Sequence, residues 1–189
     1  MSLKEIARIK IEKVKDSDGL YNLEEEISII SPFMRIAFVE KTKYGQMYYK
    51  LEFTDVGKDK YMNKFYSYIH TIENIFFNKI SYLLKLEGCQ LSSQIYKKAN
   101  SKYDPILTVK IPKDKKKKYI CAKILNSDRR TFYDIQRNEI VRVKITAKYI
   151  WTNKKKMTLR WNVKELEFKN SDNDNDNDND NDNDNDNDY

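Results

Sequence analysis

The sequence predicts a β-rich α+β domain that has one long helix inserted among its strands and an acidic tail after them. Apolar and polar residues alternate in several short segments, which is the period of half-buried strands. In residues 59–87 the apolar residues recur at three-, four- and seven-residue spacings, which is the period of an amphipathic helix. After residue 170 the chain alternates Asp and Asn up to a final Tyr. Residues 1–170 therefore predict one ordinary domain, and residues 171–189 a disordered tail.

The first predicted strands form a hairpin. Residues 33–41 are rich in β-forming side chains, and residues 43–46 contain Gly45 and predict a turn. Apolar side chains then occupy every second position, namely Met47, Tyr49, Leu51 and Phe53. We expect this second strand to bury one face.

The predicted helix follows the hairpin. Its apolar stripe contains Tyr61, Phe65, Tyr68, Ile69, Ile72, Phe76, Ile80, Leu83 and Leu84. Gly88 is well placed to end the helix, because glycine adopts the left-handed conformation of many helix termini. His70, the only histidine, lies beside the stripe, and we expect it to be structural rather than catalytic.

Strands resume after the helix. Residues 106–111 and 119–125 predict two short strands on either side of a lysine-rich loop. The next strand is long, and one face is expected to hold Val141, Val143, Ile145, Ala147, Tyr149 and Trp151. A short basic turn at residues 153–156 leads to a last strand, whose buried face is expected to hold Met157, Leu159, Trp161 and Val163. We expect the last two strands to form an antiparallel pair, with both tryptophans in the core.

Together these elements predict six or seven strands with one helix midway. Short-linked strands on both sides of a helix match a small closed or partly closed barrel that the helix caps. An oligonucleotide-binding (OB)-fold-like antiparallel barrel is therefore the expected architecture. A plain α+β sandwich is the alternative.

Charge is distributed unevenly along the chain. The tail holds nine of the 29 acidic residues and none of the 36 basic ones, so residues 1–170 have a net charge of +16. Residues 97–170 contain 22 basic and 7 acidic side chains, whereas residues 1–96 contain 14 and 13. The second half of the domain is thus predicted to bind a polyanion, and the tail itself resembles one.

Aromatic side chains accompany the basic clusters. Single-stranded nucleic acid needs cations along its phosphates and ring faces for its unstacked bases, and this combination favours single strands over duplex. Phe132 and Tyr133, next to two arginines, are the expected stacking rings. The predicted nucleic-acid-binding residues are Lys115, Lys116, Lys117, Lys118, Tyr119, Arg129, Arg130, Phe132, Tyr133, Arg142, Lys144, Lys148, Lys154, Lys155, Lys156 and Arg160.

Several classes of chemistry are not indicated. The sequence has no His/Cys set with zinc spacing, no Gly-rich phosphate loop and no hydrolase motif, so we expect no cofactor, no metal and no enzymatic activity. Cys89 and Cys121 are few and far apart, which predicts reduced thiols in an intracellular compartment. The first fifteen residues contain no uninterrupted apolar run, so neither a signal peptide nor a membrane span is expected there.

The basic body, the long helix and the acidic tail that ends at Tyr189 resemble the single-stranded-DNA-binding proteins of short-tailed coliphages and their relatives in large nucleo-cytoplasmic DNA viruses. The segment YIWTNKKKMTLRWNV also resembles the last strands of the viral relatives. The resemblance implies sequence-nonspecific binding of single-stranded DNA in viral DNA replication or recombination. In the phage family the tail shields the DNA-binding cleft and contacts replication proteins once DNA displaces it, which implies such contacts for Tyr189.

Other functions stay open at this point. An RNA-binding or transcription-associated module would share the basic surface. A structural or interaction protein could carry the Asp-Asn tail as a low-complexity repeat that arose by slippage. The expected location is the host cytoplasm, at a viral replication site, or the virion. A homodimer is one of the oligomeric states that the sequence leaves open.

Overall fold

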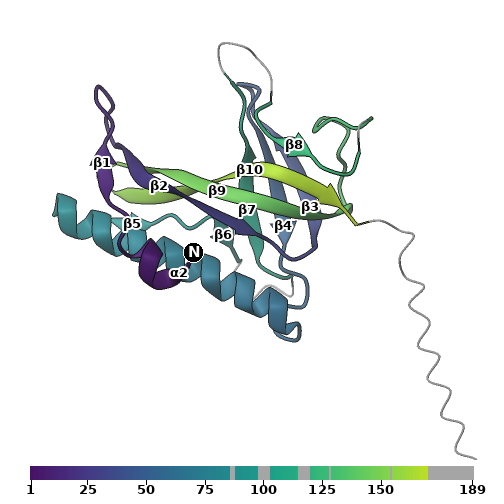
Figure 1. Ribbon diagram of the computed structural model, residues 1–189, viewed down its shortest axis with the longest axis horizontal. Coiled ribbons are helices and arrows are strands. Elements are labelled where there is room, and N and C mark those ends of the chain that lie inside the picture. Colours follow the sequence, from purple (N-terminus) through teal and green to yellow (C-terminus); the bar gives the residue numbers. More distant parts are fainter. Residues whose placement is uncertain (86–87, 98–102, 115–119, 128, 154, 170–189) are drawn as a thin grey trace, which may run out of the picture.

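The computed structural model describes residues 1–85, 88–97, 103–114, 120–127, 129–153 and 155–169. This part of the chain contains one long helix and a ten-stranded sheet (Figure 1). The elements are α1 (Leu3–Ile6), β1 (Ile11–Lys13), β2 (Leu20–Ile30), β3 (Met34–Lys41), β4 (Met47–Glu52), α2 (Lys60–Leu84), β5 (Gln90–Leu91), β6 (Ile95–Tyr96), β7 (Ile106–Ile111), β8 (Lys123–Ile124), β9 (Ile140–Thr152) and β10 (Lys156–Phe168). The predicted β-rich class with one long helix is confirmed. The predicted tail lies outside the described residues.

Five strands form a closed path. β3 pairs with β4 and β4 with β7, both antiparallel. β7 then meets β10 in parallel through a single residue pair, and β10 pairs with β9. β9 returns to β3, so the sheet curls back onto its first strand. This path of five strands, with α2 inserted between the second and the third, is consistent with the predicted OB-like barrel.

The other strands extend or decorate the barrel. β2 pairs with β9 and carries β1 on its outer side, whereas β5 and β8 pair with β10 and β6 pairs with β7. The sequence predicted six or seven strands and missed β1, β2, β5 and β6. Strands β1, β5 and β6 are short, and the apolar pattern of β2 is interrupted by three glutamates. The strand predicted over residues 119–125 is shorter, because only Lys123–Ile124 pairs as a strand.

Asp59 caps the N-terminus of helix α2. The Asp59 carboxylate accepts hydrogen bonds from the backbone N–H groups of Tyr61 and Met62 at 2.7 and 2.9 Å, which satisfies two donors at the helix start. The helix ends at Leu84, followed by Lys85 in the left-handed conformation, so Gly88 does not end it as predicted. Tyr61 and Leu83 were expected in the apolar stripe, but both are exposed, because they lie near the ends of the helix.

A buried carboxylate links α2 to the barrel. Glu73 is fully buried and accepts hydrogen bonds from Ser93 Oγ at 2.5 Å, from the Gln94 N–H at 3.1 Å and from Trp161 Nε1 at 3.2 Å. Burial raises its pKa, and the three donors oppose that rise. Trp161 is in the core, as predicted. Figure 1 shows α2 along one side of the sheet, with β3, β4 and β7 gathered at the far end of the long strands.

The long strand β9 changes its buried face partway. Val141, Val143, Ile145 and Ala147 are buried as predicted, but Ile150 is buried, Trp151 is half-buried and Tyr149 is exposed. The reason is a register shift against both neighbours, between Asn22 and Ile27 of β2 and between Leu159 and Trp161 of β10. An inserted residue reverses which side chains face inward. The prediction that Tyr149 shares the face of Val141 to Ala147 is therefore wrong, and Trp151, which was expected in the core, is only half-buried.

Candidate nucleic-acid interface

Part of the predicted basic surface lies outside the described residues. This is true of the lysine run Lys115–Lys118 with Tyr119, of Lys154 and of the tail residue Tyr189. Their roles stay predictions. Lys155, Lys156 and Arg160 are exposed near the β9–β10 turn, and Lys148 is half-buried on β9.

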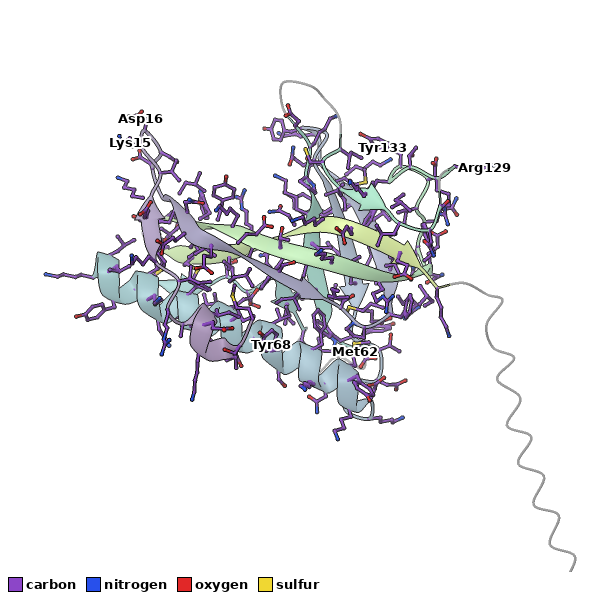
Figure 2. The ribbon with its side chains drawn as sticks, in the orientation of Figure 1. Lys15, Asp16, Met62, Tyr68, Arg129 and Tyr133 are labelled. Carbon is purple, nitrogen blue, oxygen red and sulfur yellow. The ribbon has the colours of Figure 1, made fainter. Side chains whose placement is uncertain are left out.

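The two expected stacking rings lie in opposite environments. Tyr133 is 51% exposed, and Lys41 Nζ lies 5.4 Å from the centre of its ring. Phe132 is only 5% exposed and packs against Tyr49, whose hydroxyl donates to the Phe132 carbonyl at 2.6 Å. Phe132 therefore belongs to the core and cannot stack on a base, which corrects the prediction. Figure 2 shows Tyr133 and Arg129 on the same outer side of the protein, away from Met62 and Tyr68 of α2.

Three basic side chains of β9 and β10 are held by carboxylates. Arg142 pairs with Glu167 at 2.7 Å, and Lys144 pairs with Glu165 at 3.3 Å. A third pair joins these strands to β2 (Lys164 to Glu26 at 3.2 Å). We call these six residues the paired face. Because each cation has an internal partner, this surface attracts phosphates less than the sequence predicted.

The arginines before β9 also differ in their contacts. Arg130 pairs with Glu139 at 2.5 Å, and its guanidinium lies 4.1 Å from the centre of the Phe168 ring. Arg129 is exposed and has no carboxylate within 4.0 Å among the described residues. Both arginines were predicted to bind nucleic acid, and of the two only Arg129 has its charge available to a ligand.

A ring-lined hollow lies elsewhere, on the side of β3, β4 and β7. Its volume is about 480 Å³, and three exposed rings surround it: Phe38 at 47%, Tyr96 at 62% and Tyr103 at 68% exposed. We call this hollow the ring cleft, and its lining residues are Arg35, Ala37, Phe38, Glu52, Tyr96, Tyr103, Asp104, Ile106 and Arg137. Single exposed rings are common on protein surfaces, but exposed apolar side chains that gather around one hollow mark a candidate binding site.

The two arginines of the ring cleft differ in their partners. The Arg137 guanidinium lies 5.0 Å from the centre of the Phe38 ring and has no carboxylate within 4.0 Å among the described residues. Arg35 is engaged instead, since its Nε donates to Glu52 Oε2 at 2.7 Å and its Nη1 donates to Asn138 Oδ1 at 3.3 Å. Arg137 therefore offers the cleft a charge beside a ring, which is the combination that single-stranded nucleic acid needs.

Aromatic and basic side chains also lie on β3, β4 and β7 between the ring cleft and the β3–β4 turn, although Lys50 among them pairs with Glu40 at 2.7 Å. On the outer side of the barrel, Phe38 lies opposite Lys50, and Tyr48 lies opposite Lys110. The turn itself carries Tyr44, exposed, with Lys43 Nζ 5.1 Å from the centre of its ring. From Glu52 to the turn the strand is roughly 17 Å long, at ~3.4 Å per residue. This is the outer face of the second and third barrel strands, where OB folds bind oligonucleotides.

The loop at residues 129–139 places Arg137 and Tyr133, and we call it the latch loop. Phe132 and Ile135 anchor it in the core, and the Asn138 N–H donates to the Ile36 carbonyl at 2.8 Å. Burial raises the pKa of Tyr49, so its hydroxyl keeps its proton and its hydrogen bond to the loop. The loop is thus fixed against β3 by apolar and polar contacts together.

Two solved structures of phage proteins are similar to this one. The crystal structure of gp2.5, a single-stranded DNA binding protein encoded by bacteriophage T7, has a TM-score of 0.49 and 12% sequence identity, over 76% of this chain and 86% of that chain. The single-stranded DNA-binding protein from bacteriophage Enc34, as a C-terminal truncation, has a TM-score of 0.42 and 12% identity, over 90% and 97%. No protein-family model matches the sequence, and neither does any curated protein.

Both structures are of phage single-stranded-DNA-binding proteins, the kind of protein that the sequence resembles, whereas the resemblance to relatives in large DNA viruses stays a prediction. No helix in the described part of the chain is long and apolar enough to cross a membrane. The same part contains no group of three or more His, Cys, Asp or Glu side chains that could hold a metal ion.

Sequence reasoning missed every ring of the ring cleft. Phe38 was assigned only to a β-rich segment, and Tyr96 and Tyr103 lie outside the predicted helix and strands. The physical reason for Phe38 is a register shift between Ile36 and Phe38, which turns its side chain outward. The shift cannot be read from composition, since it appears only when β3 is paired with β4.

Proposed function

We propose that this protein binds single-stranded DNA without requiring a particular sequence, in viral DNA replication or recombination. The strand lies across the outer face of β4 and β7, from the ring cleft to the β3–β4 turn. The observation that carries the proposal is the ring cleft itself, where three exposed rings surround a guanidinium that is not held by a described carboxylate.

The rings decide between single strands and duplex. Cations alone attract phosphates of any polynucleotide, so they give affinity and salt dependence but no preference for unpaired bases. Ring faces contribute ~1–3 kcal/mol per stacked base, and they reach only bases that are free of a partner strand. Phe38, Tyr96 and Tyr103 should therefore supply the preference, and Arg137 with Lys43 part of the electrostatic attraction.

We also propose that residues 171–189 compete with DNA for this surface. The tail carries nine Asp and no basic residue. As a flexible chain it has a root-mean-square span of ~25 Å, whereas a 170-residue domain has a radius of gyration of ~15 Å. It can therefore reach across its own domain at an effective concentration on the order of mM. Its final Tyr189 is the expected contact for replication proteins once DNA displaces the tail.

The test compares one fluorescently labelled sequence as single strand and as duplex, between about 50 and 200 mM salt, by anisotropy. Wild-type protein should prefer the single strand. The triple variant F38A/Y96A/Y103A should lose most of that preference, on the order of 100-fold in single-strand affinity, and keep its duplex affinity. Tyr82→Ala is the matched control, because this ring is 85% exposed on α2, away from the cleft lining. Equal binding of single strand and duplex by the wild type would refute the proposal.

A second arm deletes residues 171–189. The shortened chain should bind single strands more tightly at low salt and show a steeper salt dependence, because the competing polyanion is gone. Unchanged affinity at low salt would remove the tail from the mechanism and leave the cleft in place. An RNA oligomer of the same sequence tests the alternative function, which tighter binding of RNA would favour.

A further inference from the structure

The ring cleft contains two carboxylates, Glu52 and Asp104, beside its rings and arginines. A surface that only tracks phosphates gains nothing from carboxylates, since they repel the backbone of the strand. Their place among ring faces indicates that they face the bases. Carboxylates there would act on the polar edge of a base whose flat face stacks on the rings.

Glu52 is held in position rather than free to turn away. It is only 7% exposed, and its Oε2 accepts from Arg35 Nε, which is itself tied to Asn138. The other carboxylate oxygen, Oε1, has no hydrogen-bond partner among the described residues. One acceptor of a nearly buried and fixed carboxylate is therefore left for a ligand in the cleft.

Asp104 has a similar arrangement at the same hollow. Its Oδ2 accepts from the Asp55 N–H at 3.0 Å, and Oδ1 makes no hydrogen bond to any other described residue. The cleft thus combines acceptor-only groups with Arg137 beside Phe38. A nucleotide fits this charge distribution in one orientation, with its base toward the carboxylates and its phosphate toward Arg137.

We propose that the ring cleft holds one unpaired base and selects bases that carry an exocyclic amino group over thymine. The amino group of cytosine donates hydrogen bonds, which a carboxylate accepts. Thymine presents a carbonyl oxygen at the same place, so two acceptors would face each other and the free carboxylate oxygen would gain no donor. Cytosine and thymine have the same ring size, so stacking differs little between them. The selection rests on the proposed function, since it requires that single strands occupy the cleft.

The test measures the affinity of the full-length protein for oligo-dC and oligo-dT of about ten nucleotides, within the site sizes of OB folds, at one salt concentration and near neutral pH. We expect about 5- to 10-fold tighter binding of oligo-dC, the size of a carboxylate-to-amino contact. Equal affinities, or tighter binding of oligo-dT, would overturn the selection without any variant being needed.

Two variants assign the selection to the carboxylates. Glu52→Gln and Asp104→Asn replace an acceptor-only group by an amide that also donates to the thymine carbonyl. Each should lower the dC-to-dT ratio, and the double variant should bring it below about twofold. Glu25→Gln, an exposed carboxylate on β2, is the control and should leave the ratio unchanged. If Glu52→Gln unfolds because Arg35 loses its partner, Asp104→Asn alone decides. A wild-type ratio in all folded variants would contradict the assignment.

The outcome also separates this inference from the proposed function. If both oligomers bind equally and F38A/Y96A/Y103A weakens both, the cleft binds single strands without selecting bases, and only the inference fails. If duplex of the same sequence binds as well as both oligomers, the proposed function fails first.

Discussion

The ring cleft and the paired face are two polar surfaces of one barrel, and they use their charges in opposite ways. On the paired face, Arg142 and Lys144 are joined to Glu167 and Glu165. In the ring cleft, Arg137 lies against the ring of Phe38, without a carboxylate partner in the described part of the chain. The paired face has more charged side chains, but each is held by a partner, whereas the ring cleft has fewer and leaves Arg137 accessible beside a ring. A charged side chain attracts a ligand more strongly when no neighbouring side chain of opposite charge already pairs with it.

The largest expected effect comes from the latch loop, which supplies Arg137 to the ring cleft and also carries the buried Phe132 and the exposed Tyr133. Phe132→Ala removes a buried ring and should lower the free energy of unfolding by about 3–5 kcal/mol. Tyr133→Ala, the next residue, should change stability by less than about 0.5 kcal/mol and weaken single-strand binding instead. Chemical denaturation and anisotropy on both variants check this. Equal losses of stability would show that the two rings are not in different environments.

The second test compares one arginine from each region. Arg137→Gln should weaken single-strand binding about 10-fold and reduce the salt slope by about 1, because one phosphate contact is lost. Arg142→Gln should change affinity by no more than roughly twofold, because that charge is already balanced by Glu167. Salt-titrated anisotropy measures both. A larger loss for Arg142→Gln would reverse the roles of the two surfaces.

A smaller effect is expected when the paired face is unmasked. The double variant E165Q/E167Q frees Lys144 and Arg142, so binding should tighten a few-fold at low salt. The gain should be the same for single strand and duplex, since the described residues of this face include no ring with the exposure of those in the cleft. A gain restricted to single strands would show that the paired face reads unpaired bases.

The smallest effect concerns His70, which belongs to neither surface. Burial lowers its pKa below 6.5, so the unfolded chain binds the proton more tightly than the folded one. Stability should therefore fall slightly, by less than ~1 kcal/mol after solvent screening, as pH drops through the unfolded pKa toward the lower folded value. Thermal melts near pH 7 and pH 6 should show the decrease in wild type and not in His70→Phe. Binding at either surface should not change.

Patterns of local spacing predicted much of the barrel. The alternation from Met47 to Phe53 and the stripe from Phe65 to Ile80 placed β4 and α2 correctly, because each pattern is decided by residues close in the chain. The candidate site was harder to predict. Whether a lysine or arginine is paired depends on a strand far away in sequence, as Arg142 and Glu167 show.

The ring cleft depends on still longer connections. Phe38, Tyr96 and Arg137 come from three separate segments, and they meet only because β3, β6 and the latch loop are brought to the same side of the barrel. No run of basic residues marks any of them. A count of charge along the chain therefore pointed to the second half of the domain, whereas the cleft draws residues from both halves.

The position of β9 in the sheet affects how the chain folds. It pairs with β2, β3 and β10, so three parts of the chain depend on residues 140–152 for their backbone partners. Pairing between strands that lie far apart in sequence slows folding, because closing a long loop costs entropy before the strand contacts can stabilise the chain. During synthesis the early strands and α2 therefore wait with unpaired edges until the last third of the domain emerges, and that interval is when aggregation or a chaperone would compete for the nascent chain.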